Sequence, residues 1–204
     1  MAKKEENKDL LENPEVIADK LEGVEHWIEK HLTIVLSAVG GLALIIAGYF
    51  GFQYWTSSQD AQAQKEMFQA VRYFETDSLK LALNGDGNNL GFLQIIDDYS
   101  MTDAGKLANF YVGAIYMKQS KFQPAILYLE DYKSNDLLVQ ARAYSLIGDA
   151  HMELKDFDNA VKYYNKAANH EPNKYFSPSY LMKAALAYEK LNQNDKAKDV
   201  YQKI

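Results

Sequence analysis

A long uncharged segment near the N-terminus dominates the hydropathy pattern. No Asp, Glu, Lys or Arg occurs from Leu32 to Gln59, and residues 32–55 read LTIVLSAVGGLALIIAGYFGFQYW. At a helical rise of about 1.5 Å per residue, such a segment crosses a hydrocarbon core about 30 Å thick. Trp27 precedes the segment and Tyr54 and Trp55 end it, where aromatic rings favour the headgroup level. The pattern predicts one transmembrane helix at residues 32–55.

A cleaved secretory signal is the rival interpretation, because Ala61-Gln62-Ala63 resembles a cleavage site. Signal peptides carry a shorter apolar core, about 7 to 15 residues, after a brief basic segment. Here residues 1–31 contain five Lys against nine acidic residues, so we favour an uncleaved anchor. Lys30 abuts the span, whereas the far flank begins with uncharged residues. The positive-inside rule then predicts a single-pass protein with a cytoplasmic N-terminus and residues 56–204 outside the cytoplasm.

The acidic leader, residues 1–31, contains a helix-start signature at Asn13-Pro14-Glu15. The apolar residues Ile17, Leu21, Val24 and Ile28 follow at helical spacing, which predicts an amphipathic helix. Two interpretations stay open: a helix lying on the cytoplasmic membrane surface, or one that docks to a cytoplasmic partner.

Small side chains gather on one face of the predicted span. With about 100° per residue, a single arc collects Ser37, Gly40, Gly41, Ala47, Gly48 and Gly51. Small faces let helix backbones approach closely in lipid, so this face is a candidate contact with another membrane protein. The alternative is incidental composition, because Gly is frequent in spanning helices generally.

Beyond the span, residues 60–83 have an approximate helical apolar face, so we expect one long helix from Asp60 to Leu83. Residues 84–89, NGDGNN, then break it. Their alternating oxygen side chains imitate the start of a calcium loop, but Asn89 and Ile95 replace the Gly and Glu that such a loop needs. We therefore expect a glycine turn, followed by a further helix at about Leu90–Tyr99.

The remaining sequence repeats itself. Gly113, Gly148 and Ala185 stand 35 and 37 residues apart. Tyr116, His151 and Tyr188 follow three residues later, and Ala125, Ala160 and Ala197 follow twelve residues later. This spacing resembles the tetratricopeptide repeat, a helix pair with small residues at the contact between its two helices. The resemblance implies an all-α protein, with the transmembrane helix followed by a helical solenoid whose repeats lie at about 106–139, 141–174 and 178–204. The helix expected at Leu90–Tyr99 would be the degenerate second helix of a preceding unit. Residues 60–204 would then form about three and a half units, with the helix from Asp60 as the opening piece.

The amino-acid composition excludes several classes of function. The net charge of −6 at 204 residues is the wrong sign for a general nucleic-acid binder, and the absence of Cys excludes thiolate metal sites and cysteine nucleophiles. His151 occupies the aromatic position of the repeat, so we expect it to be buried in the helix pair. With no catalytic constellation in the sequence, we predict a non-enzyme with no cofactor and no metal site.

A tetratricopeptide array binds other proteins along the inner face formed by the first helix of each repeat. The repeat register places groove positions at Leu107, Phe110, Ala114 and Met117, at Arg142, Ser145, Asp149 and Met152, and at Ser179, Met182, Leu186 and Glu189. Of these, Leu107, Phe110, Met117, Met152, Met182 and Leu186 form the candidate partner-binding groove. Adaptable Met side chains suit apolar or helical segments. The alternative is that the helix beginning at Asp60 folds into this groove.

The whole arrangement is similar to the YfgM-like family of ancillary subunits of the SecYEG translocon. The resemblance rests on the acidic leader, one span ending in Gln53-Tyr54-Trp55, and the small repeat domain; Gln53 replaces the basic residue common there. It implies a bacterial inner-membrane protein whose periplasmic domain assists translocated chains, beside the translocon and a PpiD-like prolyl isomerase. An envelope-assembly or division scaffold and a cytoplasm-facing adaptor remain the alternatives.

Overall fold

The computed structural model describes residues 24–204, and within that range every regular element is helical, with no strand. The chain divides into two compact units, Met1–Tyr54 and Trp55–Ile204, and each is treated separately below. The expected all-α class is therefore confirmed. The leader helix expected from Asn13 lies mostly outside the described residues; residues 24–30 are helical.

The helix α3 (Leu32–Glu75) contains the whole apolar segment and continues beyond it. Its apolar part has the length and composition of a membrane span, with a mean hydropathy of 2.1 over the most apolar window and none of that window buried within the chain. No charged or helix-breaking residue separates the apolar segment from the part that follows. The helix therefore runs without interruption from the first unit into the second.

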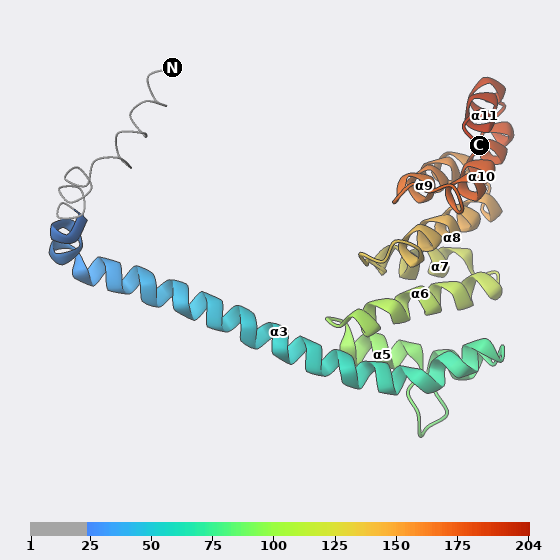
Figure 1. The fold of residues 1–204 in the computed structure, drawn as a ribbon. Helices are drawn as coiled ribbons and strands as arrows, with labels where there is room; N and C mark the ends of the chain where they lie inside the picture. Colours follow the sequence, from blue (N-terminus) through green and yellow to red (C-terminus); the bar gives the residue numbers. More distant parts are fainter. Residues whose placement is uncertain (1–23) are drawn as a thin grey trace, which may run out of the picture. The chain divides into compact units, whose positions relative to one another are not determined.

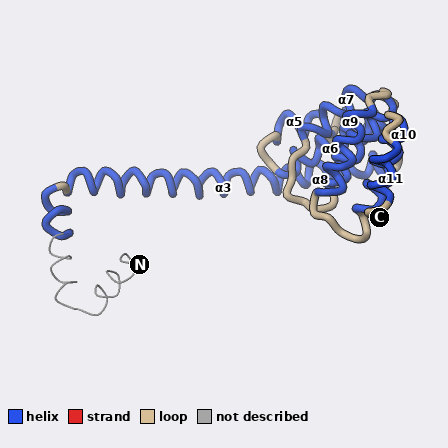
Figure 2. Tube along the Cα trace, turned by 90° about the horizontal axis from the view of Figure 1, so that it is seen from above, coloured by secondary structure: helices blue, strands red, loops and turns tan. Residues whose placement is uncertain are grey.

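The second unit is built from helix pairs (Figures 1 and 2). The C-terminal part of α3 is followed by α4 (Leu79–Asn84) and α5 (Phe92–Tyr99). Three pairs come next, which are α6 (Asp103–Lys118) with α7 (Phe122–Asp131), α8 (Val139–Glu153) with α9 (Phe157–Asn169), and α10 (Ser177–Lys190) with α11 (Asn194–Tyr201). Each pair also packs against its neighbour, α7 on α8 and α9 on α10, so the pairs stack into a solenoid.

The small residues of the repeat lie where the two helices of a pair touch. A Cβ atom added to Gly113 would lie 2.5 Å from Cγ of Leu129, and one added to Gly148 would lie 2.6 Å from the Tyr164 ring. Both distances are far below van der Waals contact. A side chain at either position would therefore force Leu129 or the Tyr164 ring to move.

The expected helix from Asp60 to Leu83 is wrong at its C-terminal end. The chain leaves α3 after Glu75 through Asp77, which has a left-handed φ of 58°. The N–H of Ser78 donates to the carbonyl of Tyr73 at 2.8 Å, the bond that closes a Schellman turn. The same turn recurs within the later pairs, with left-handed residues at Ser120, Lys155 and Asn192.

This turn lies within the repeat unit upstream of the other three, for which a degenerate second helix was expected at about Leu90–Tyr99. Ala70 and Ala82 are fully buried, and they stand twelve residues apart, as Gly113 and Ala125 do. The C-terminal part of α3 is thus the first helix of this unit. Its second helix is split into α4 and α5 by the loop at residues 85–91, so the step from Ala70 to Gly113 is 43 residues.

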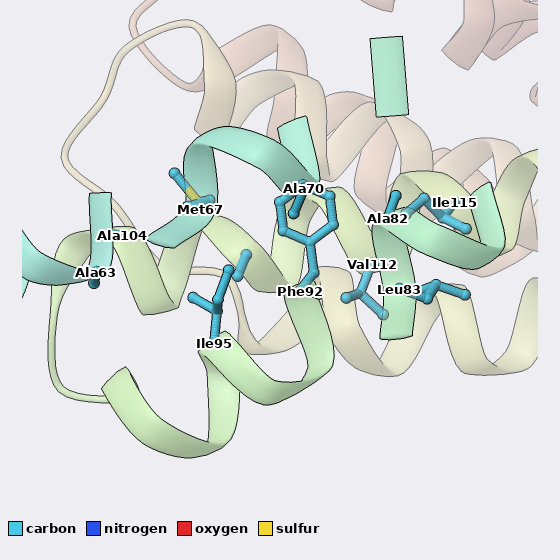
Figure 3. Packing of buried hydrophobic residues seen from close by; sticks show 11 residues of the cluster. Ala63, Met67, Ala70, Ala82, Leu83, Phe92, Ile95, Ala104, Val112 and Ile115 are labelled. Atoms are coloured by element: carbon cyan, nitrogen blue, oxygen red, sulfur yellow. The ribbon is translucent and has the colours of Figure 1, made fainter. Parts of the chain in front are cut away.

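The largest core cluster joins this upstream unit to α6 (Figure 3). Phe92 and Ile95 of α5 are fully buried against α3 and α6, and Phe92 stacks on Tyr111 with ring centroids 4.7 Å apart. The members of the cluster are Ala63, Met67, Ala70, Ala82, Leu83, Phe92, Ile95, Ala104, Ala108, Val112 and Ile115. The C-terminal part of α3 is therefore an integral part of the repeat domain.

Candidate protein-binding groove

A pocket of about 480 Å³ opens between the C-terminal part of α3, the start of α6 and the loop between α7 and α8. We call it the α3–α6 pocket. Its walls are mainly apolar, and its charged residues, which carry both signs, come from the start of α6 and from the loop. The lining consists of Gln64, Met67, Phe68, Val71, Asp103, Ala104, Lys106, Leu107, Tyr132, Lys133, Ser134, Asp136 and Val139.

The upstream repeat unit explains why this pocket is apolar. In the register set by Ala70, the groove positions two, five and nine of that unit are Gln64, Met67 and Val71, and all three line the pocket. Phe68 adds a large side chain that is 63% exposed. These α3 residues were absent from the expected groove because the loop at residues 85–91 hides the period. The spacing of Ala70, Tyr73 and Ala82 is the sequence signal that identifies them.

The six residues expected to form the groove differ in how far the structure exposes them. Leu107 lines the α3–α6 pocket. Phe110 and Met117 are half-buried against the core beneath α8, and the Phe110 ring lies 5.6 Å from the Tyr132 ring. Met152 is half-buried in the next core. Met182 and Leu186 of α10 are both exposed, at 45% and 46%.

The structure also differs from the expected alternative, in which the helix that begins at Asp60 fills the groove. That part of α3 packs on α5 and α6 as the first helix of a repeat, and it forms one wall of the pocket. Asp60 fixes its position, because its Oδ1 accepts the N–H of Ala104 at 2.8 Å in the first turn of α6. The helix therefore borders the pocket and leaves it open.

A polar cluster occupies the inner face farther along the solenoid. Lys183 of α10 lies 2.8 Å from Oδ2 of Asp149 and 3.1 Å from Oγ of Ser145, both on α8. The hydroxyl of Tyr164 donates to Oδ1 of Asp149 at 2.7 Å. Burial, and then this hydrogen bond to a carboxylate, raises the pKa of Tyr164 above its ordinary value. The cluster links α8, α9 and α10, and it interrupts the apolar surface.

His151 has a structural environment, as expected from its place in the repeat. Its side chain is 13% exposed, and its Nδ1 lies 3.1 Å from Oδ2 of Asp156. The imidazole also stacks on Tyr163, with centroids 5.6 Å apart. These contacts hold the turn between α8 and α9.

The one carboxylate of the loop at residues 85–91, that of Asp86, accepts hydrogen bonds from other groups of the protein. Asp86 accepts hydrogen bonds from the Tyr73 hydroxyl at 2.6 Å and from the backbone N–H groups of Asn88 and Asn89. These bonds, led by that of Tyr73, hold the pKa of Asp86 well below its usual range. Across residues 24–204, no group of three or more acidic or His side chains could hold a metal ion.

In the first unit, the small-residue face of α3 is open. No other described side chain or backbone atom lies within 4 Å of a Cβ built on Gly40, Gly41, Gly48 or Gly51. The Ser37 hydroxyl donates within the helix to the carbonyl of Thr33 at 2.8 Å. Larger side chains at the four glycines would therefore meet no clash within this part of the chain.

The fold and the stacked pairs define the C-terminal part of the chain as a tetratricopeptide-repeat region. Such regions are helical solenoids that bind other proteins. Models of the tetratricopeptide repeat match residues 141–174 and 179–204. The chain is also similar to the uncharacterized protein ycf37 of Guillardia theta, with 33% identity over 101 residues. That match covers 47% of this chain and 55% of the relative, so the chain spans about half the length of the curated relative.

The fold is similar to that of a solved structure, the crystal structure of MamA. The TM-score is 0.55 at 16% identity, and the match covers 74% of this chain and 81% of the other. At this identity the similarity concerns the fold alone. It supports the helical-repeat architecture of the second unit.

Proposed function

We propose that the protein is a non-enzymatic, membrane-anchored module that binds apolar segments of other proteins on the inner face of its repeat domain. The observation that carries the proposal is the α3–α6 pocket, in which Met67, Phe68 and Leu107 line an open cavity of about 480 Å³. Met and Phe side chains provide adaptable apolar contact area. A pocket of this size accepts a few apolar side chains of an extended or helical segment.

We further propose that all six predicted groove residues contribute to binding, in two different ways. Leu107 contacts the bound segment in the pocket, and the exposed Met182 and Leu186 extend the contact surface along α10. Phe110, Met117 and Met152 are half-buried, so they support the shape of the inner face from beneath. The Asp149–Lys183 pair would add a polar contact between the two apolar regions.

In its finer form, the proposal assigns the protein to the Sec translocon as an accessory subunit. The apolar part of α3 anchors it in a bacterial inner membrane with the N-terminus in the cytoplasm and residues 56–204 in the periplasm. The repeat domain then receives chains as they leave SecYEG, together with a PpiD-like prolyl isomerase. Support comes from the resemblance of the whole arrangement to the YfgM-like family and from Lys30 beside the span.

Two measurements test this assignment. In intact spheroplasts, an added protease should digest residues 56–204 and spare the leader, whereas protection of the repeat domain until lysis would reverse the topology. Mild crosslinking followed by purification in detergent should recover SecYEG subunits. Recovery of cell-division or envelope-assembly proteins in their place would contradict the translocon assignment and favour a scaffold.

The small-residue face of the span is proposed as the contact with the membrane partner. Gly41→Leu combined with Gly48→Leu should release the partner in detergent, because the added side chains hold the two helix backbones apart. Neither substitution clashes with described atoms of the chain itself. Ile46→Leu, at an exposed position outside the face, is the matched control. Equal recovery of the partner with both proteins would show that the glycines are incidental.

A further inference from the structure

The two edges of the repeat domain differ in character. At one edge, the chain turns from the first to the second helix of each pair, and the residues at the tips are Asp77, Ser120, Lys155 and Asn192. These side chains are all polar. At the other edge, the chain passes from one pair to the next and exposes Met101, Leu137, Leu138, Tyr175 and Phe176. We call this second edge the apolar edge.

The apolar edge is strongly exposed. Tyr175 is 75% exposed, Met101 61%, and Leu137 and Leu138 are 55% and 52% exposed. Leu137, Leu138 and Phe176 line one small pocket, so the second and third loops adjoin each other. Folding of the domain gains little from these side chains, since they bury only part of their surface. Such a group of exposed apolar residues is typical of a contact surface.

Local hydrogen bonds hold the loops in the conformations that present these side chains. Oδ1 of Asp136 accepts the N–H groups of Leu138 at 2.9 Å and Val139 at 2.7 Å. In the next loop, Oδ1 of Asn173 accepts the N–H groups of Tyr175 at 3.1 Å and Phe176 at 2.9 Å. Four backbone N–H groups at the tips are therefore hydrogen-bonded within the protein. Moving these loops into a poorly hydrated region therefore costs less free energy than moving loops whose N–H groups are unpaired.

The apolar edge is also the edge at which α3 enters the domain. Figure 1 shows that α6 and α8 run in the same direction as the C-terminal part of α3, so the loops that lead into them lie at the end where that part begins. The loop that leads into α10 adjoins the one before α8. The hydrogen bond from Ala104 to Asp60 fixes the first of these loops beside the start of that part. Asp60 follows Trp55, the end of the apolar segment, by only five residues. At about 1.5 Å per residue, this is a short distance from the expected headgroup level.

We propose that the apolar edge inserts into the headgroup and acyl boundary of the bilayer that α3 spans, so that the repeat domain lies against the membrane surface. This inference rests on the proposed membrane anchor. The apolar edge carries both aromatic and aliphatic side chains, which suits the membrane–water interface. Amphipathic rings such as that of Tyr175 are favoured there. The second and third loops each contain one Lys and one acidic residue, so their formal charges cancel. Apolar burial therefore drives the contact, and anionic lipid adds little.

The natural absence of Cys makes a direct test possible with the full chain. Leu137→Cys and Tyr175→Cys are labelled separately with a nitroxide and reconstituted in phosphatidylcholine vesicles. Lys121→Cys, exposed at the polar edge, is the matched control. Collision rates with lipid-soluble oxygen and with a water-soluble nickel chelate then report the depth of each probe. The ratio of oxygen to nickel collisions should be several-fold higher at positions 137 and 175 than at position 121.

A fourth probe separates the two proposals. Ile46→Cys reports whether the apolar part of α3 is in the bilayer. If this probe is in lipid while those at 137 and 175 collide with nickel as freely as the probe at 121, the membrane contact of the apolar edge is wrong and the anchor stands. If the probe at 46 is itself in water, the anchor fails and the edge proposal fails with it. Shielding of 137 and 175 from both reagents only after a partner protein is added would assign the edge to a protein contact and overturn the proposal.

Discussion

Replacement of Phe92 with alanine is expected to lower the free energy of unfolding of the repeat domain by about 3–5 kcal/mol. Phe92 is fully buried between the upstream repeat unit and α6, and its ring stacks on that of Tyr111. Removal of the ring loses its burial and leaves a cavity that rigid helix pairs cannot close. Urea unfolding of the full chain in detergent micelles, followed by circular dichroism, measures the change.

The matched control for this prediction is Phe68→Ala. Phe68 is the same residue type but is 63% exposed, so its replacement should change the free energy of unfolding by about 0.5 kcal/mol or less. A loss of stability that is equally small for both variants would mean that α5 and the C-terminal part of α3 are not part of the cooperative core.

Phe68→Glu is expected to weaken the binding of apolar peptides more than tenfold without loss of folding. The side chain lines the α3–α6 pocket and is largely exposed, so a carboxylate there stays hydrated in the free protein. A bound apolar segment would have to remove that hydration, which costs free energy only in the complex. Fluorescence anisotropy with a labelled peptide from an apolar segment of a secreted protein measures the affinity.

Leu127→Glu is the control for the binding experiment. Leu127 is 60% exposed on α7 and lies outside the pocket, so the same charge should leave peptide affinity unchanged. Phe110→Glu is a poor test, because Phe110 is half-buried against Tyr132 and the charge would disturb folding. Equal affinity of Phe68→Glu and the parent protein would exclude the α3–α6 pocket as the binding site.

The sequence was sufficient to predict the fold class because its signals are local and regular. The uncharged segment at 32–59 and the spacing of Gly113, Gly148 and Ala185 each depend on neighbouring residues in one helix or one helix pair. The upstream unit was expected only as a degenerate partial repeat, and its groove residues were not identified, because the loop at residues 85–91 lengthens its step. The end of α3 escaped because Asp77 adopts a left-handed turn without the Gly that usually marks one.

The candidate site was less predictable, because it depends on contacts between units. The repeat register identified Leu107 as a groove residue, but Tyr132 at the end of α7 and Val139 at the start of α8 line the pocket from a region that follows the register only approximately. The ion pair of Asp149 with Lys183 joins two successive repeats, and residues 34 apart show no pairing signal in one sequence. Packing between stacked units decides such contacts.

Site-specific photocrosslinking from position 68 tests the central claim most directly. A photoreactive phenylalanine analogue replaces Phe68 in the full chain, which is expressed in its native membrane, and a second protein carries the analogue at Leu127. If the repeat domain is a membrane-anchored binding module for translocated chains, position 68 should crosslink to SecYEG subunits or to chains in transit, and position 127 should not. Absence of adducts at position 68, or the same adducts at both positions, would contradict the account.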